Sequence, residues 1–213
     1  MTLEETLAQI KPLDKNAMDV AAKRWDSIAK PLHSLGKMEK LVIQIAGITG
    51  NPDMKIQKRA LVPMCADNGV VEEGVTQTGQ EVTAIVAENF LSGDTSACVM
   101  SRQCGTKVIP VDIGMAVDTK VSKELKVAYG TANMTKGPAM TRAQAVQALE
   151  AGIEMVRRLK EEGYGLLATG EMGIGNTTTS SAVASVLLDR SVEEMTGRRS
   201  EEHTSELQSL YLI

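Results

Sequence analysis

The sequence predicts an α/β protein whose parallel sheet is built from alternating strands and helices. Short, nearly continuous apolar runs, such as residues 60–66, are typical of strands buried on both faces, and they alternate with amphipathic stretches of helical period. The predicted strands at 60–66, 107–111 and 166–169 are followed by polar residues and glycine, as expected at the carboxyl edge of such a sheet. Only 2% of the residues are aromatic, so the core must consist of aliphatic side chains and methionines.

The N-terminal part, residues 1–52, is expected to be helical and to form a smaller domain. Amphipathic patterns predict helices over residues 3–10 and 16–28. A third helix is expected to start at the segment Ser34-Leu-Gly-Lys. The serine of this segment is the expected N-cap, and the alternative is an anion site made by the N–H groups and the lysine.

Residues 53–198 are expected to form the α/β domain. Strands are predicted over residues 60–66, 107–111 and 166–169, with a possible short strand at 126–129. Helices are predicted over residues 81–90, 95–103, 141–161 and 177–188. The helix at 141 should begin with a capping box, because Thr141 is followed three residues later by Gln144.

The composition excludes several classes of protein. The net charge is -4, which gives no electrostatic reason to expect nucleic acid or an anionic membrane as a partner. We find no apolar run long enough to cross a membrane, and the acidic start does not resemble a signal peptide. The 3 cysteines form no disulfide framework or zinc motif. We therefore expect a cytoplasmic protein without a metal or cofactor.

The most informative stretch follows the last predicted strand and reads Gly170-Glu-Met-Gly-Ile-Gly-Asn-Thr-Thr178. We call residues 170–178 the glycine turn. Gly173 and Gly175 allow a close approach of the backbone, and Asn176, Thr177 and Thr178 supply polar groups at a helix start. This pattern favours a phosphate cradle. The alternative is a tight strand-to-helix turn in which the asparagine caps the helix.

Three acids lie at the ends of predicted strands. Glu171 is suited to a sugar hydroxyl or a developing positive charge, since a carboxylate would repel a phosphate; the alternative is a solvated loop acid. Asp67 and Asp112 could bind sugar hydroxyls or a metal ion. The alternative is that each caps the turn that follows its strand.

Four stretches together resemble one family, the nicotinate-nucleotide–dimethylbenzimidazole phosphoribosyltransferases of cobalamin synthesis. The resemblance runs from the first helices to about residue 198. The stretches are Lys30-Pro-Leu-His-Ser-Leu-Gly36; Met64-Cys-Ala-Asp-Asn-Gly-Val70 with Glu73-Gly-Val75; Gly130-Thr-Ala-Asn133 with Gly137-Pro-Ala-Met-Thr141; and the glycine turn.

The resemblance implies a Rossmann-like, three-layer fold and a homodimer. It also implies a reaction in which nicotinate mononucleotide gives its phosphoribosyl group to 5,6-dimethylbenzimidazole, forming α-ribazole 5′-phosphate and nicotinate. Glu171 then matches the acid on the ribose side, and Thr78 matches a small hydroxyl near the benzimidazole. Asn68 stands where the family usually has histidine, and Val86 where one branch has glutamine. These two differences bear on the choice of base.

The C-terminal end departs from the family. The resemblance places the proton-accepting glutamate in a later segment, so we expect this chain to be truncated, its sheet incomplete and its activity lost. Residues 199–213 are expected to be an artefactual tail, because residues 200–209 resemble a translated sequencing adapter; the alternative is a natural polar tail. Two other functions remain open, a non-catalytic nucleotide- or phosphate-binding module and a purely structural scaffold.

Overall fold

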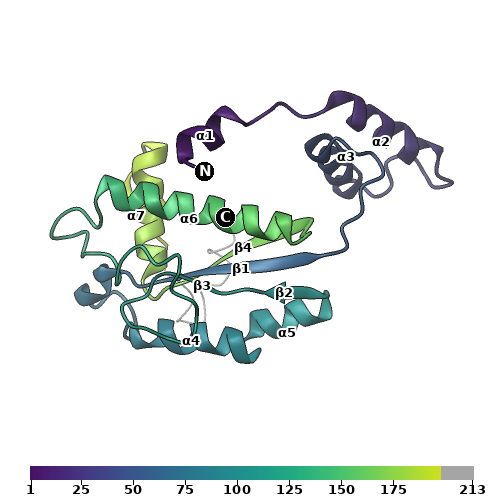
Figure 1. The fold of residues 1–213 in the computed structure, drawn as a ribbon. Coiled ribbons are helices and arrows are strands. Elements are labelled where there is room, and N and C mark those ends of the chain that lie inside the picture. The colour runs from purple at the N-terminus through teal and green to yellow at the C-terminus, as the bar shows by residue number, and fades with distance from the viewer. Residues whose placement is uncertain (198–213) are drawn as a thin grey trace.

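The computed structural model describes residues 1–197 and contains a parallel sheet between two layers of helices (Figure 1). The central strand is β1 (Arg59–Ala66), which pairs in parallel with each of the other strands. These are β2 (Thr106–Val108), β3 (Val111–Gly114) and β4 (Leu166–Met172). The predicted Rossmann-like α/β class is thereby confirmed.

The helices also follow the predicted order along the chain. They are α1 (Leu3–Ala8), α2 (Lys15–Ser27), α3 (Lys37–Thr49), α4 (Glu81–Ser92), α5 (Ser96–Gln103), α6 (Arg142–Glu161), α7 (Asn176–Leu188) and α8 (Val192–Met195), together with the short 3₁₀ helix η1 (Gly69–Glu73). The capping box that was predicted at Thr141 is confirmed, because its hydroxyl accepts from the Gln144 N–H and the Gln144 side chain accepts from the Thr141 N–H.

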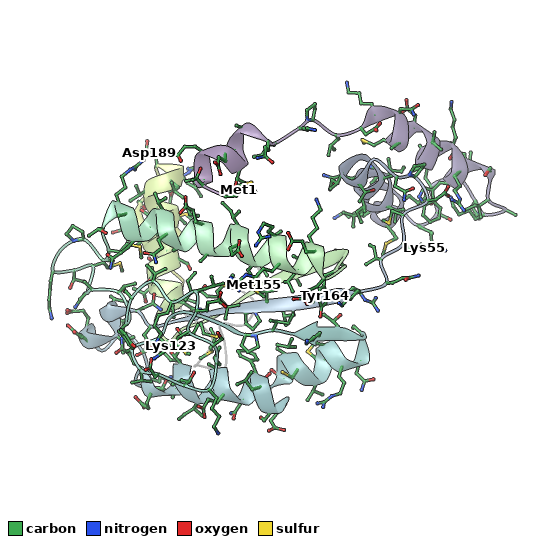
Figure 2. All side chains as sticks on the ribbon, in the orientation of Figure 1. Met1, Lys55, Lys123, Met155, Tyr164 and Asp189 are labelled. Carbon is green, nitrogen blue, oxygen red and sulfur yellow. The ribbon has the colours of Figure 1, made fainter. Side chains whose placement is uncertain are left out.

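Helices pack on both faces of β1 because its successive side chains point to opposite sides. On the face covered by α6, Ala60 and Val62 are buried with Leu159 and Tyr164. Met155 of α6 packs against this cluster from above the sheet (Figure 2). The opposite face carries a second buried cluster, formed largely by α4, α5 and the loop after β3 around the central strand. The two clusters explain why β1 is apolar without alternation.

The predicted strand at 107–111 is broken into β2 and β3. Both segments keep the same register with β1, since Leu61 pairs with Val108 and Met64 pairs with Val111. This register places Pro63 opposite Pro110. The Ile109 N–H donates to the Leu61 carbonyl, so the next hydrogen bond of this ladder would come from position 63. Pro63 has no N–H, and the ladder is interrupted there and resumes at Val111.

The strand predicted at 126–129 is wrong, and the chain there belongs to a loop. Val127 donates one backbone hydrogen bond to Ile113 at 3.0 Å. Gly130 then adopts a φ of 84°, which turns the chain away from a strand path. We call residues 115–130 the β3 loop.

The N-terminal helices lie in two places. Helices α2 and α3 pack together apart from the sheet, whereas α1 lies over α6 (Figure 1). The Leu3 N–H donates to the Glu150 carboxylate of α6 at 3.0 Å. The N-cap predicted at Ser34 is wrong, because α3 is capped by Gly36 at a φ of 56°, a backbone conformation that favours glycine. The division between residues 1–52 and 53–198 stays a prediction.

Helix α7 carries exposed apolar side chains on its outer side. Val186 and Leu187 are 81% and 78% exposed, and in the described part of the chain β4 has a strand partner on its β1 side alone. No helix within residues 1–197 is long and apolar enough to cross a membrane. The tail predicted at 199–213 lies outside the described residues.

Candidate functional site

Three strand ends meet at one edge of the sheet. Cys65 of β1 pairs with Asp112 of β3 on one side and with Met172 of β4 on the other. The residues that follow these strands are therefore neighbours, as the parallel topology requires. This edge brings together Asp67, Asp112 and the glycine turn, the segments that the sequence analysis singled out.

The glycine turn lies very close to β1. A Cβ atom on Gly173 would come within 2.3 Å of the Ala66 carbonyl oxygen, so this position requires glycine. Gly175 has a φ of 83° and is the N-cap of α7, without a side-chain cap. Asn176 is thus the first residue of the helix, and the alternative in which it caps α7 is not what the structure contains.

This start of α7 has the features of an anion site. The first N–H groups of a helix have no acceptor within the helix, and the helix dipole gives them a partial positive charge. Thr177 is exposed and Thr178 is half-buried, so both residues reach the surface of the first turn. Phosphate or another anion is the ligand that this arrangement suits. Binding by these residues remains a prediction.

Asn68 connects the end of β1 to the glycine turn. Its side-chain NH₂ donates to the Ile174 carbonyl at 3.1 Å, and its side-chain oxygen accepts from the Thr179 hydroxyl at 2.9 Å. The Ile174 N–H in turn donates to the Thr83 hydroxyl of α4 at 3.1 Å. Asn68 is 7% exposed and Thr83 is fully buried. The turn is therefore held by neutral polar side chains from two elements and from α7 itself.

Glu171 is an exposed residue near the carboxyl end of β4, opposite Met64 in the register. It lines a groove of about 440 Å³. The other lining residues come from α7: Asn176, Thr179, Ser180, Val183, Ala184, Leu187 and Leu188. Glu171 thus stands beside a recess large enough for part of a nucleotide. Its role toward a sugar remains a prediction.

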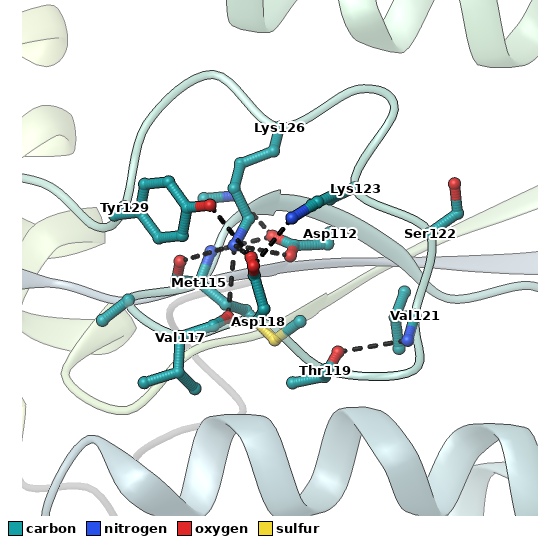
Figure 3. Close-up of polar contacts among 12 residues, drawn as sticks. Asp112, Met115, Val117, Asp118, Thr119, Val121, Ser122, Lys123, Lys126 and Tyr129 are labelled. Atoms are coloured by element: carbon teal, nitrogen blue, oxygen red, sulfur yellow. Dashed lines mark hydrogen bonds and ion pairs between the residues drawn. The ribbon is translucent and has the colours of Figure 1, made fainter.

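Asp112 is fully buried and is used by the loop that follows it. One carboxylate oxygen accepts from the N–H groups of Gly114 and Met115, at 3.1 and 2.9 Å, and the other is 2.9 Å from the Lys126 ammonium (Figure 3). Lys126 also donates to the Met115 and Val117 carbonyls. The turn-capping alternative describes this geometry; substrate binding by Asp112 stays a prediction.

Asp67 is buried in a similar way, with 1% exposure. One of its carboxylate oxygens accepts from the Ala116 N–H at 2.7 Å, which ties the β3 loop to the end of β1. Its backbone carbonyl accepts from the Thr131 N–H at 3.0 Å. These contacts make Asp67 a support for the loop, and its contact with a substrate stays a prediction.

Two of the motifs that carried the resemblance meet next to this edge. The Gly69 N–H donates to the Thr131 hydroxyl at 3.0 Å, and Asn133 donates to the Glu73 carboxylate at 2.6 Å. Hydrogen bonds from Asn133 and Thr135 lower the pKa of Glu73. The acids of η1 are thus occupied in holding the 130–136 segment.

Thr78 lies in the loop between η1 and α4 and accepts, through its carbonyl, from the Thr76 hydroxyl at 2.8 Å. Two residues later, the Gln80 side chain donates to the Asn68 carbonyl at 3.0 Å, which fastens the end of this loop to the site. The place of Thr78 beside a base stays a prediction.

The buried Cys65 lies between two strands at this edge of the sheet. Burial raises the pKa of the Cys65 thiol to about 12, so it is not a nucleophile at neutral pH. Within residues 1–197, no three histidine, cysteine or acidic side chains gather as possible metal ligands.

Sequence reasoning missed Lys126, Thr83 and Asn133. Lys126 was placed in a possible short strand, and its buried ion pair with the strand-end residue Asp112 was not predicted. Thr83 carried no local signal, because its partner Ile174 lies far along the chain. Asn133 belongs to a stretch that carries the resemblance, but its hydrogen bond to the distant Glu73 could not be predicted from that stretch.

Comparisons with known proteins agree with this arrangement. A family model described as phosphoribosyltransferase matches residues 10–209. The nicotinate-nucleotide–dimethylbenzimidazole phosphoribosyltransferase of Ruminiclostridium cellulolyticum is 50% identical over 200 residues, which cover 93% of this chain and 57% of that protein. The protein of the same name from Clostridium tetani is also 50% identical, with 93% and 55% covered.

A solved structure gives the same result. The crystal structure of CobT from Thermus thermophilus superposes with a TM-score of 0.80 at 36% identity and covers 89% of this chain and 58% of that one. This chain thus spans little more than half the length of the relatives it matches. From the family model together with these relatives, the chain belongs to the nicotinate-nucleotide–dimethylbenzimidazole phosphoribosyltransferase family.

Proposed function

We propose that the protein to which this chain corresponds transfers the phosphoribosyl group of nicotinate mononucleotide to 5,6-dimethylbenzimidazole. The observation that carries the proposal is the glycine turn at the carboxyl edge of β4, with Glu171 beside it. The names of the relatives, which contain nicotinate nucleotide and dimethylbenzimidazole, support it. A homodimer in the cytoplasm is part of the same proposal.

In the proposed reaction a nitrogen of the benzimidazole attacks C1′ of the ribose, on the face opposite the nicotinate. The bond from C1′ to the nicotinate nitrogen breaks, and its electron pair neutralises the positive ring. The benzimidazole loses its N–H proton to a base, which we place in the portion of the relatives that this chain does not span. Substrate positioning and electrostatic stabilisation are what the described residues would supply.

The roles assigned to these residues follow from their chemistry. The N–H groups at the start of α7, with Thr177 and Thr178, would bind the phosphate. Gly173, through its close approach to β1, and Gly175, through its left-handed backbone, would shape the turn that receives the sugar phosphate. The carboxylate of Glu171 would stabilise the positive charge that develops on the ribose as the nicotinate leaves.

Binding and turnover test different parts of the proposal. We expect the chain to bind nicotinate mononucleotide in a calorimetric titration, and Glu171→Gln to weaken this binding; the matched control is Glu193→Gln in α8. Turnover by residues 1–213, followed as α-ribazole 5′-phosphate by chromatography, should be about 10²–10⁴-fold below that of the R. cellulolyticum relative, because we place the base in the portion of the relatives that these residues do not span. Equal turnover would contradict the assignment of the base. An absence of binding would contradict the phosphoribosyl site itself.

The second candidate function is a nucleotide-binding module without catalysis. It is favoured by the charge-neutral hydrogen bonding around the glycine turn, which joins Asn68, Thr83 and Thr179 without any ionisable group. Binding of nicotinate mononucleotide without turnover in the chain joined to the remaining portion of the R. cellulolyticum relative would support this candidate over the transferase.

A further inference from the structure

We propose that Asn68 is a positioning residue that holds the glycine turn in the conformation that accepts the phosphoribosyl group. The resemblance connected Asn68 with the choice of base, because the family usually has histidine there. The contacts of its side chain point instead to the phosphate side of the site. This inference rests on the proposed function and assigns a further residue to it.

Hydrogen bonds hold the peptide groups on both sides of Ile174. Its N–H donates to the Thr83 hydroxyl at 3.1 Å, and its carbonyl accepts from the Asn68 amide at 3.1 Å. Each of these groups belongs to a planar peptide unit, so the two hydrogen bonds fix the direction of the planes on both sides of Ile174. The left-handed Gly175 follows directly, and the first N–H groups of α7 come after it.

The Asn68 amide is itself held in one orientation. The Ile174 carbonyl can only accept, so the Asn68 NH₂ faces it, and the Asn68 side-chain oxygen then accepts from the Thr179 hydroxyl at 2.9 Å. The Asn68 carbonyl accepts from Gln80 at 3.0 Å, which fixes the backbone at this position as well. With 7% of its surface exposed, Asn68 has little freedom to adopt other rotamers.

The geometry of the glycine turn makes this clamp necessary. Gly175 adopts a φ of 83°, which other residues rarely reach, and glycine at 173 and 175 also gives the chain freedom to leave its conformation. The close approach of Gly173 to Ala66 does not fix the direction of the Ile174 carbonyl, whereas the hydrogen bond from Asn68 does. A clamp that acts before the ligand arrives lowers the cost of ordering the site on binding.

The chemistry of the clamp also suits its place. Asn68, Thr83 and Thr179 are neutral, so none of them repels a phosphate or forms an ion pair with Glu171. A neutral imidazole likewise offers one N–H donor and one acceptor nitrogen. Histidine at position 68 would therefore supply a donor and an acceptor at this place.

The test pairs a variant of similar size that loses the polar contacts with a variant that keeps them. Thr179→Val removes the hydroxyl that orients Asn68, and Thr179→Ser keeps it. Asn68→Leu removes both contacts, and Asn68→His restores a donor and an acceptor. Thr6→Val in α1, whose hydroxyl donates to the Thr2 carbonyl at the surface, is the control. The affinities for nicotinate mononucleotide and for nicotinate riboside, which lacks the phosphate, are measured by calorimetry on each variant.

We expect the ratio of these two affinities to fall about tenfold in Thr179→Val and further in Asn68→Leu, the size expected for one and for more than one lost hydrogen bond. Thr179→Ser, Asn68→His and the control should retain the ratio. A general loss of structure would lower both affinities together and would leave the ratio unchanged. An unchanged ratio in both Thr179→Val and Asn68→Leu overturns the role of Asn68. If the unsubstituted chain shows no preference for the phosphorylated ligand, the proposed function fails and this inference fails with it.

Discussion

Two turns at the same edge of the sheet are built on opposite principles. The turn after β3 is held by Asp112 of that strand, whose buried charge is matched by Lys126 and by two backbone N–H groups (Figure 3). The glycine turn after β4 is held by neutral hydrogen bonds through Asn68. The first turn uses the Asp112 carboxylate and the Lys126 ammonium within the fold, whereas the second leads into the start of a helix, where the helix dipole favours an anion. We call the turn after β3 the closed turn and the glycine turn the open turn. The closed turn stabilises the fold, and the open turn is the one that we expect to bind a ligand.

The largest expected effect comes from breaking the closed turn. Lys126→Met leaves the Asp112 carboxylate without its cation, at a position where the Lys126 and Asp112 side chains are 6% and 0% exposed. Removing one partner of a buried ion pair typically costs about 3–5 kcal/mol. Denaturant unfolding measures this loss. Lys123→Met is the control, because the Lys123 ammonium pairs with Asp118 at the surface, where solvent screening leaves an ion pair with little effect on stability.

Lys126→Met also tests whether the turn after β3 takes part in ligand binding. At a temperature where Lys126→Met remains folded, its affinity for nicotinate mononucleotide should equal that of the unsubstituted chain. A large loss of affinity in the folded variant would mean that the turn after β3 belongs to the binding site, the role that the sequence analysis considered for Asp112.

The second prediction breaks the open turn. Gly173→Ala places a methyl group against the Ala66 carbonyl, a contact with backbone that cannot move aside cheaply. We expect about 1–3 kcal/mol of destabilisation from overpacking, together with a loss of nucleotide binding that exceeds the loss in Lys126→Met. Thermal unfolding and calorimetry measure the two effects.

Gly152 of α6 offers a matched control for this substitution. A Cβ atom there meets no other atom within 4 Å, so Gly152→Ala should raise stability by about 0.5–1 kcal/mol through helix propensity and leave binding unchanged. If Gly173→Ala lost no more stability than Gly152→Ala, this would contradict the close packing of the glycine turn against β1.

The smallest expected effect is a dependence of folding stability on pH in the acidic range. Hydrogen bonds from Lys123 and Tyr129 lower the pKa of Asp118, in the β3 loop, to about 2, below the ordinary value of 3.8. Because the folded state favours the charged carboxylate, this contribution to stability is present above about pH 4 and is lost as the pH falls toward 2. Asp118→Asn should therefore show a flatter loss of stability than the unsubstituted chain between about pH 4 and pH 2, measured by urea unfolding across that range. An identical slope in the two proteins would show that the contacts of Asp118 do not stabilise the β3 loop.

The sequence predicted the elements better than it predicted the contacts between them. The strand at β1, the helix at α6 and the glycine turn are defined by local patterns of apolar residues, caps and glycines, and each was found in place. The break between β2 and β3 depends on Pro63 of the neighbouring strand, which lies beside this segment only in the folded sheet, so the pattern of residues 107–111 alone does not reveal it.

The site shows the same limit. The position of Glu171 at the end of its strand follows from the sequence, but the clamp formed by Asn68, Thr83 and Thr179 joins residues up to 111 positions apart. Local propensity carries no information on such pairs. Lys126 was assigned to a strand because its neighbours are apolar, although its buried charge and its contacts to the β3 loop decide its conformation.

Amide chemical shifts of the ¹⁵N-labelled chain during a titration with nicotinate mononucleotide test the central claim most directly. We predict that the largest shifts fall on residues 173–178, with smaller ones on Glu171 and Asn68. Saturable binding that shifts other residues and leaves this segment unmoved would contradict the claim that the glycine turn binds the phosphoribosyl group.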